Sequence, residues 1–147
     1  MPTDATAPAP FRAILCHFDS YSAALNFACW PERRLLWPNP LPECAALGPV
    51  SLPRDGEDAR QAMARALGLP DSELVWAPDY DQGLQTPEGE IRVHLLRSTA
   101  FEPPTEALEA AGGAFKPISA LRGYPPVELA LVREVFNLIV GGAGHRA

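Results

Sequence analysis

The chain has 147 residues, of which 47% are hydrophobic and 20% are charged, as expected for one soluble globular domain with its own core. Its formal net charge of −6 disfavours a nucleic-acid backbone as a partner. No run reaches the roughly 18 apolar residues of a membrane span, and the N-terminal segment lacks the pattern of a signal peptide, so we expect no membrane partner. Three widely spaced cysteines favour a reducing cytoplasm over a disulfide framework.

The first part of the chain predicts short strands. Residues 1–10 are rich in Pro, Ala and Thr, which is typical of a terminal tail. The apolar run 11–18 has strand character. Residues 25–30 and 34–37 flank a short polar turn, so we interpret them as the two strands of a hairpin.

A short helix is predicted within residues 48–69. Asp55 can cap its start, and apolar residues then recur at helical spacing, which indicates one buried face. Gly68 suits the C-terminal cap and Pro70 prevents the helix from continuing. An acidic start followed by a basic residue two turns later is an arrangement that often holds a metal ion or a phosphate.

Two further strands and a final helix follow. Residues 73–77 and 91–98 read as strands, and the alternation in the second predicts one buried face. The final helix is predicted between Pro125-Pro126 and Gly141-Gly142. Phe136 lies in the middle of its apolar face and is expected to be buried against the sheet. The helix also carries residues that are expected to stay polar, namely Glu128, Arg133, Glu134 and Asn137.

This order of elements predicts the fold class. Strands, helix, strands and helix indicate an α+β domain, an α/β/α sandwich in which a mixed β-sheet lies between a short central helix and a C-terminal helix. We expect a single domain at residues 11–141, with flexible tails at 1–10 and 142–147.

The central stretch resembles the signature of the Nudix family, G-x5-E-x7-R-E-U-x-E-E-x-G-U, where U is a bulky aliphatic residue. Gly56-Glu57 matches its frequent Gly-Glu pair, and seven residues separate Glu57 from Arg65. Leu67 fits the aliphatic position, and Gly68-Leu69 is similar to the closing pair. A hairpin before this stretch and a C-terminal helix after it also resemble the family. The resemblance implies a Nudix-like fold and hydrolysis of nucleoside-diphosphate-linked substrates with Mg²⁺.

The departures from that signature concern the metal ligands. Ala66 stands where the family has a glutamate, the two adjacent glutamates are absent, and the box is about one helical turn short. A hard divalent cation needs several converging carboxylate oxygens, and this helix offers only Glu57 and Asp58. We therefore predict no catalytic residues, no metal site and no cofactor. If the domain is active, Glu57 and Asp58 are the catalytic candidates, with Mg²⁺ as cofactor and loop acids such as Asp79, Asp81 or Glu90 as further ligands.

Five residues are candidates for binding a ligand. Arg65 is expected to approach Glu57 or a nearby backbone carbonyl, as the resemblance implies. Arg92 and His94 share one face of a strand, which suits an anion or simply water. Aromatic residues on a sheet can stack a flat ligand or form core. The ligand-binding candidates are Arg65, Arg92, His94, Trp76 and Tyr80.

Two functions from different classes remain open at this point. The favoured one is a Nudix-like domain that has lost metal-dependent pyrophosphohydrolase activity and binds a small, nucleotide-like molecule or a protein partner. The alternative is a divergent Nudix hydrolase that cleaves nucleoside-diphosphate-linked substrates with Mg²⁺. A homodimer is a further open prediction.

Overall fold

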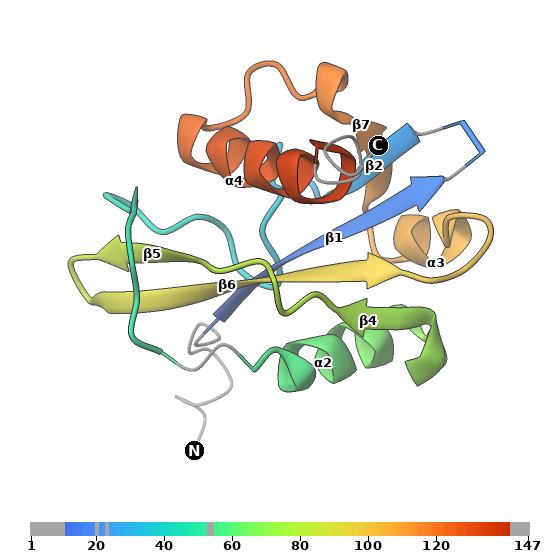
Figure 1. The fold of residues 1–147 in the computed structure, drawn as a ribbon, viewed down its shortest axis with the longest axis horizontal. Coiled ribbons are helices and arrows are strands. Elements are labelled where there is room, and N and C mark those ends of the chain that lie inside the picture. The colour runs from blue at the N-terminus through green and yellow to red at the C-terminus, as the bar shows by residue number, and fades with distance from the viewer. Residues whose placement is uncertain (1–10, 20, 23, 53–54, 142–147) are drawn as a thin grey trace.

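The structure is a computed structural model and describes residues 11–19, 21–22, 24–52 and 55–141. In this part of the chain, a seven-stranded mixed sheet lies between helices on its two faces (Figure 1). The strands are β1 (Phe11–Asp19), β2 (Ala24–Cys29), β3 (Ala46–Leu47), β4 (Leu74–Trp76), β5 (Gln82–Thr86), β6 (Gly89–Ser98) and β7 (Ala114–Pro117). The α-helices are α2 (Glu57–Leu67), α3 (Thr105–Ala110) and α4 (Pro126–Phe136). The predicted fold class is confirmed, whereas the two predicted tails lie outside the described residues.

The longest strands, β1 and β6, form the middle of the sheet. The strand order is β3-β5-β6-β1-β2-β7, and β4 pairs with β6 beyond the end of β5. β1 and β6 run parallel, with Phe11 opposite Arg92 and Cys16 opposite Arg97, while the other pairings are antiparallel. β6 therefore has partners on both sides, and its residues are the ones that the rest of the fold surrounds.

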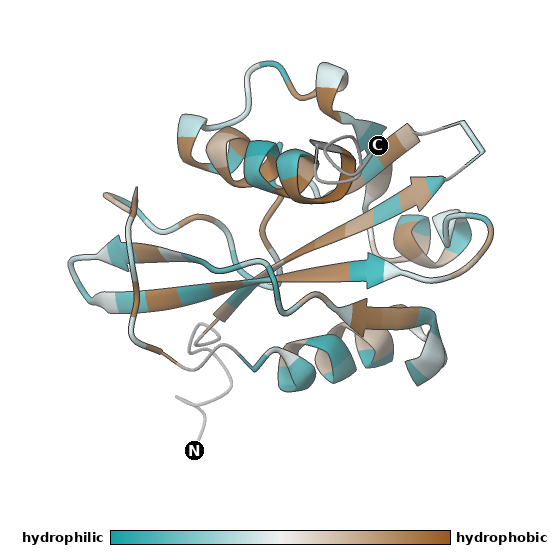
Figure 2. Cartoon of the chain, in the orientation of Figure 1, coloured by the Kyte–Doolittle hydropathy of each residue, from teal (hydrophilic) through white to brown (hydrophobic). Residues whose placement is uncertain are grey.

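Both faces of the sheet are covered, because apolar residues of β1 and β6 alternate between two cores. Ile14 and Leu95 pack in a core with α4, whereas Leu15 and Leu96 pack in a core with α2 and α3. Figure 2 shows the apolar colouring concentrated along the middle of the sheet. The prediction that residues 91–98 have one buried face was therefore wrong: a central strand between two helical layers is buried on both.

The final helix packs on the sheet through one stripe of its surface. Leu131, Val132 and Val135 are fully buried, and Glu128, one turn earlier on the same face, is only 1% exposed. Phe136 is 36% exposed, so its predicted burial was wrong, and Glu128, which was grouped with the polar residues outside the apolar face, is buried. The reason is rotation: adjacent residues on a helix differ by about 100°, so burial of Val135 turns Phe136 away from the sheet.

The central helix agrees with the sequence more closely. Asp55 Oδ1 accepts a hydrogen bond from the backbone N–H of Glu57 at 2.9 Å, and Gly68 closes the helix in the left-handed conformation at φ 68°. Met63 and Leu67 are among the residues that face the sheet. The predicted end of α2 at Gly68 is confirmed, whereas the N-cap residue is Gly56 and Asp55 lies one residue before it.

The predicted hairpin forms only in part. β2 is present, and Arg34 exchanges backbone hydrogen bonds with Trp30, but the chain then leaves β2 and Trp37 pairs with Ala13 instead. Leu35 and its neighbour Leu36 are both fully buried. In a hairpin strand with one face in solvent, successive side chains would alternate between buried and exposed. Among the described residues, no helix is long and apolar enough to cross a bilayer.

Candidate functional site

The start of α2 lies directly against the sheet, at the end of β4 and beside the middle of β6. A Cβ atom built on Gly56 would lie 2.5 Å from Cδ1 of Trp76 and 2.9 Å from Nδ1 of His94. Glycine is needed here because the backbone approaches these two rings too closely for any side chain. Trp76 and His94, from different strands, are thus brought together under the first turn of the helix.

The first turn of α2 also carries an ion pair. Nε of Arg60 lies 3.0 Å from both carboxylate oxygens of Glu57, and Nη1 of Arg60 donates to the backbone carbonyl of Asp71 at 2.7 Å. The carboxylate raises the pKa of Arg60 above its ordinary value. The predicted contact between Glu57 and Arg65 was wrong. Arg65 is exposed and lies eight residues after Glu57, a rise of about 12 Å along the helix. Arg60 lies three residues after Glu57, and residues with this spacing are neighbours on a helix.

An open hollow of about 570 Å³ lies beside this ion pair. Glu57 and Arg60 line it from α2, and half-buried Trp76 and exposed Val75 line it from β4. Asp71 and its neighbours close it from the turn that precedes β4. The hollow combines an aromatic wall with one guanidinium and two carboxylates, so its lining is mixed in polarity and slightly negative. We refer to it as the Trp76 hollow.

His94 and Arg92 share a face of β6, as predicted, but both are buried. His94 is 6% exposed, and burial lowers its pKa, with the charge of Arg92 acting in the same direction and Asp55 opposing both. A histidine of ordinary pKa is already largely neutral at pH 7, so lowering the pKa makes His94 neutral there. It therefore contributes a ring and a neutral polar edge next to Trp76.

Arg92 holds a loop to the sheet. Nη1 of Arg92 forms an ion pair with Asp81, and Nη2 donates to the carbonyls of Leu52 at 2.6 Å and Val50 at 3.3 Å. The guanidinium is almost fully buried and already has acceptors at both terminal nitrogens. Arg92 therefore attaches residues 50 and 52, which precede α2 in the chain, to β6.

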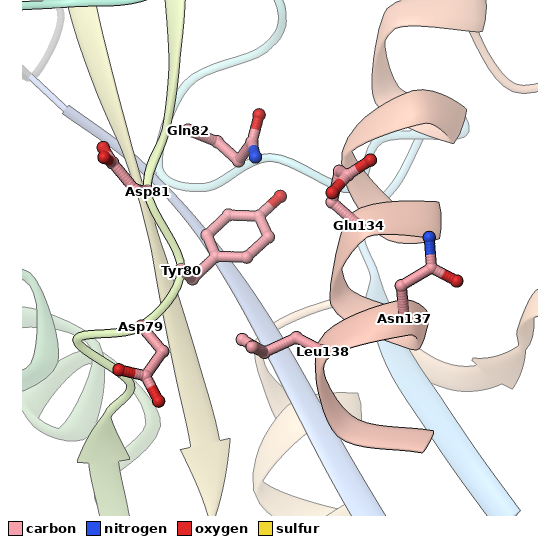
Figure 3. A pocket seen from close by; sticks show the side chains of 7 residues that line it. All are labelled: Asp79, Tyr80, Asp81, Gln82, Glu134, Asn137 and Leu138. Atoms are coloured by element: carbon pink, nitrogen blue, oxygen red, sulfur yellow. The ribbon is translucent and has the colours of Figure 1, made fainter. Parts of the chain in front are cut away.

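Tyr80 lies on the opposite side of the sheet from Trp76. It is buried against α4, donates a hydrogen bond from its hydroxyl to the carbonyl of Leu131 at 2.8 Å, and has a pKa raised well above the ordinary value by burial. A smaller cavity of about 230 Å³ lies beside Tyr80 (Figure 3). The cavity is lined by Asp79, Tyr80, Asp81, Gln82, Glu134, Asn137 and Leu138. The five predicted ligand-binding residues therefore do not form one site.

The loop acids are close in sequence but do not converge. Figure 3 shows the carboxylates of Asp79 and Asp81 pointing to different sides of the chain. Asp81 is paired with Arg92, and Glu90 accepts hydrogen bonds from the backbone N–H and the hydroxyl of Ser51, both at 3.1 Å. Asp58 is exposed on α2. No cluster of three or more His, Cys, Asp or Glu residues that could hold a metal ion occurs within the described part of the chain.

Sequence reasoning missed two charged residues of the Trp76 hollow, Arg60 and Asp71. The spacing of Glu57 and Arg60 was a readable signal, because residues three apart on a helix are adjacent. The approach of the Asp71 carbonyl depends on the turn after Pro70 and has no comparable signal. The chain matches no protein-family model, and a search of curated proteins found no match either.

Proposed function

We propose that this chain is a Nudix-like domain that binds a small planar molecule in the Trp76 hollow and does not hydrolyse diphosphates with Mg²⁺. The observation that carries the proposal is the pairing of Glu57 with Arg60 beside the ring of Trp76. The ring of Trp76 supplies a flat wall for a ligand, and the charge of Glu57 is already balanced by Arg60. The element order around α2 supports the Nudix-like relationship.

The carboxylates of α2 support the absence of metal chemistry. A hydrolase of this type needs cations that bridge protein carboxylates and the diphosphate. Glu57 already has a cationic partner, and Asp58 follows it on the helix about 100° further round. Two such groups converge poorly on one ion, and recruiting Glu57 would first require breaking its pair with Arg60.

The charges in the Trp76 hollow favour a neutral or cationic ligand. Arg60 is the one cation among its described lining residues, and that guanidinium is already shared between Glu57 and the carbonyl of Asp71. A diphosphate would bring two or more negative charges to two carboxylates. A nucleobase or nucleoside, in contrast, can stack on Trp76 and donate N–H groups to Glu57 or Asp71. We therefore propose a planar nitrogen heterocycle as the ligand class.

Isothermal titration of the chain with adenosine, guanosine, cytidine and uridine, with and without Mg²⁺, tests this function. We expect at least one nucleoside to bind without metal and to bind more tightly than its diphosphate. Trp76→Ala should weaken that binding about tenfold or more, because stacking of a base on an aromatic ring contributes about 1–3 kcal/mol. Trp76→Phe should retain most of it. Phe136→Ala, which removes an aromatic ring from α4, is the matched control and should bind normally.

Two results would contradict the proposal. One is the absence of nucleoside binding by a parent protein that melts cooperatively. The other is metal-dependent phosphate release from nucleoside-diphosphate-linked compounds that Glu57→Gln abolishes, which would establish the hydrolase instead.

A further inference from the structure

Two aromatic side chains touch one another while both remain in solvent. Tyr21, in the turn between β1 and β2, is 85% exposed, and Phe101, after the end of β6, is 76% exposed. Their ring centroids are 5.8 Å apart in an edge-to-face arrangement. The two segments lie at the same end of the molecule (Figure 1). Tyrosine and phenylalanine are enriched in interaction surfaces, so this exposed pair is a candidate contact point for a partner.

The position of this pair is defined by the chain on both sides. Oδ1 of Asp19 accepts a hydrogen bond from the backbone N–H of Tyr21 at 2.9 Å, which fixes the turn. On the other side, the hydroxyl of Thr99 donates to the carbonyl of Ser72 at 2.8 Å, just before Phe101. The exposed rings therefore belong to anchored segments, and anchoring lowers the entropic cost of binding a partner.

An acidic groove adjoins Phe101. It has a volume of about 540 Å³ and runs between the end of α2 and the start of α3, with Leu69 and Ala107 among its apolar lining residues. Glu73, Glu102 and Glu106 also line it, and none of the other described lining residues is a lysine, arginine or histidine. Within the described ranges, none of these three carboxylates belongs to an ion pair. Among the described residues, the groove therefore has negative charge with no paired cation, and Glu102, which lines it, directly follows Phe101 in the chain.

We infer that the Tyr21–Phe101 pair and the acidic groove bind a basic peptide segment of a partner protein, in which arginine or lysine alternates with apolar residues. The aliphatic part of such a side chain can lie on the rings while its cation reaches the carboxylates. Leu69 and Ala107 offer contacts to the intervening apolar residue. An anionic membrane surface fits poorly, because its charge has the same sign as the groove. This surface uses different residues from the Trp76 hollow, so the inference stands without the proposed nucleoside site.

Fluorescence anisotropy with a labelled peptide of alternating arginine and leucine tests the inference on the full chain. We expect saturable binding that weakens as salt is raised, because the attraction between exposed charges is screened. Phe101→Ala should weaken binding about tenfold or more, in the range of an interface hot spot. Because Phe101 is exposed, the variant should still fold, and a melting curve checks this. Glu102→Gln with Glu106→Gln should weaken binding and reduce its salt dependence.

The matched control for charge is Glu43→Gln with Glu88→Gln, two exposed acids on other loops. It changes the net charge by the same amount and should leave peptide binding intact. The inference is overturned if this control weakens binding as much as the groove variant, or if Phe101→Ala binds like the parent. It is also overturned if sedimentation shows a dimer that Phe101→Ala converts to a monomer, since the rings would then be covered by a second copy of the chain.

Discussion

Arg60 and Glu57 form an i, i+3 pair in which one nitrogen, Nε, is shared by both carboxylate oxygens at 3.0 Å. The side chain of Arg60 is 12% exposed and that of Glu57 is 47% exposed, so the guanidinium lies against the protein and the acid lies at the rim. The same guanidinium reaches the carbonyl of Asp71 in the turn before β4. One side chain therefore connects the start of α2 to the edge of the Trp76 hollow.

Arg60→Ala should lower the melting temperature more than Arg65→Ala. The first change removes the contacts to Glu57 and to the carbonyl of Asp71, whereas the second removes an exposed side chain from the end of the same helix. Both replace arginine by alanine on α2, so helix propensity changes equally. We expect a difference of about 2 °C by differential scanning fluorimetry. Equal melting temperatures would show that the contacts of Arg60 contribute nothing measurable, as is common for surface ion pairs.

The packing of α4 predicts a large difference in stability between two alanine variants of this helix. Leu131→Ala removes a fully buried side chain and should cost about 2–5 kcal/mol in urea unfolding, because a cavity remains. The hydrogen bond from Tyr80 is retained, since it is accepted by the backbone of Leu131. Phe136→Ala should cost less than Leu131→Ala despite the larger side chain, because Phe136 is 36% exposed. The reverse order would mean that α4 is rotated about its axis relative to this structure.

The fold class and most elements of this protein could be predicted from its sequence, because they depend on local signals. Asp55, Gly68 and Pro70 mark the limits of α2 by mechanisms that act within a few residues. The exposure of Phe136 could not be predicted in the same way. The apolar face of α4 is broad, and only its contact with the sheet decides which part of that face is covered.

The candidate site was harder to predict, because it depends on which strands become neighbours. Trp76 and His94 meet only because β4 pairs with β6, and Tyr80 is separated from them by the sheet itself. Arg92 and His94 were expected on the open face of their strand, but both are buried, and only the position of α2 against β6 shows that this face is covered. The family resemblance directed attention to Glu57 and Arg65, whereas the chemistry beside Glu57 comes from Arg60, one turn away.

Arg92 should contribute more to stability through its carbonyl contacts than through its ion pair. Its side chain is 6% exposed, but the side chain of Asp81 is 56% exposed and can be hydrated when its partner is lost. Arg92→Met, which keeps much of the volume, leaves the carbonyls of Val50 and Leu52 without this donor and should cost about 1–3 kcal/mol in urea unfolding. Asp81→Asn should cost clearly less. If both variants lose the same stability, the ion pair is the main interaction.

Glu128 should make the protein less stable as pH rises above the ordinary carboxyl range. Burial raises its pKa above the usual 4.5, while the backbone N–H of Leu35 and the nearby charge of Arg34 act in the opposite direction. Between the ordinary and the raised pKa, the folded protein keeps a proton that the unfolded chain has released. The unfolded state then binds fewer protons than the folded state, so the free energy of unfolding decreases with increasing pH across that window.

Glu128→Gln isolates this effect. The Gln side chain can still accept the hydrogen bond that Oε1 of Glu128 receives from the N–H of Leu35 at 2.9 Å, but it cannot ionise. Urea unfolding of parent and variant, compared in steps from about pH 4.5 to about pH 7.5, should show the variant gaining stability relative to the parent as pH rises. Glu128→Ala should lose about 1–3 kcal/mol at every pH, because the buried N–H of Leu35 then has no acceptor from α4. A constant difference between parent and Glu128→Gln over this range would show that Glu128 has the same pKa in the folded and unfolded states.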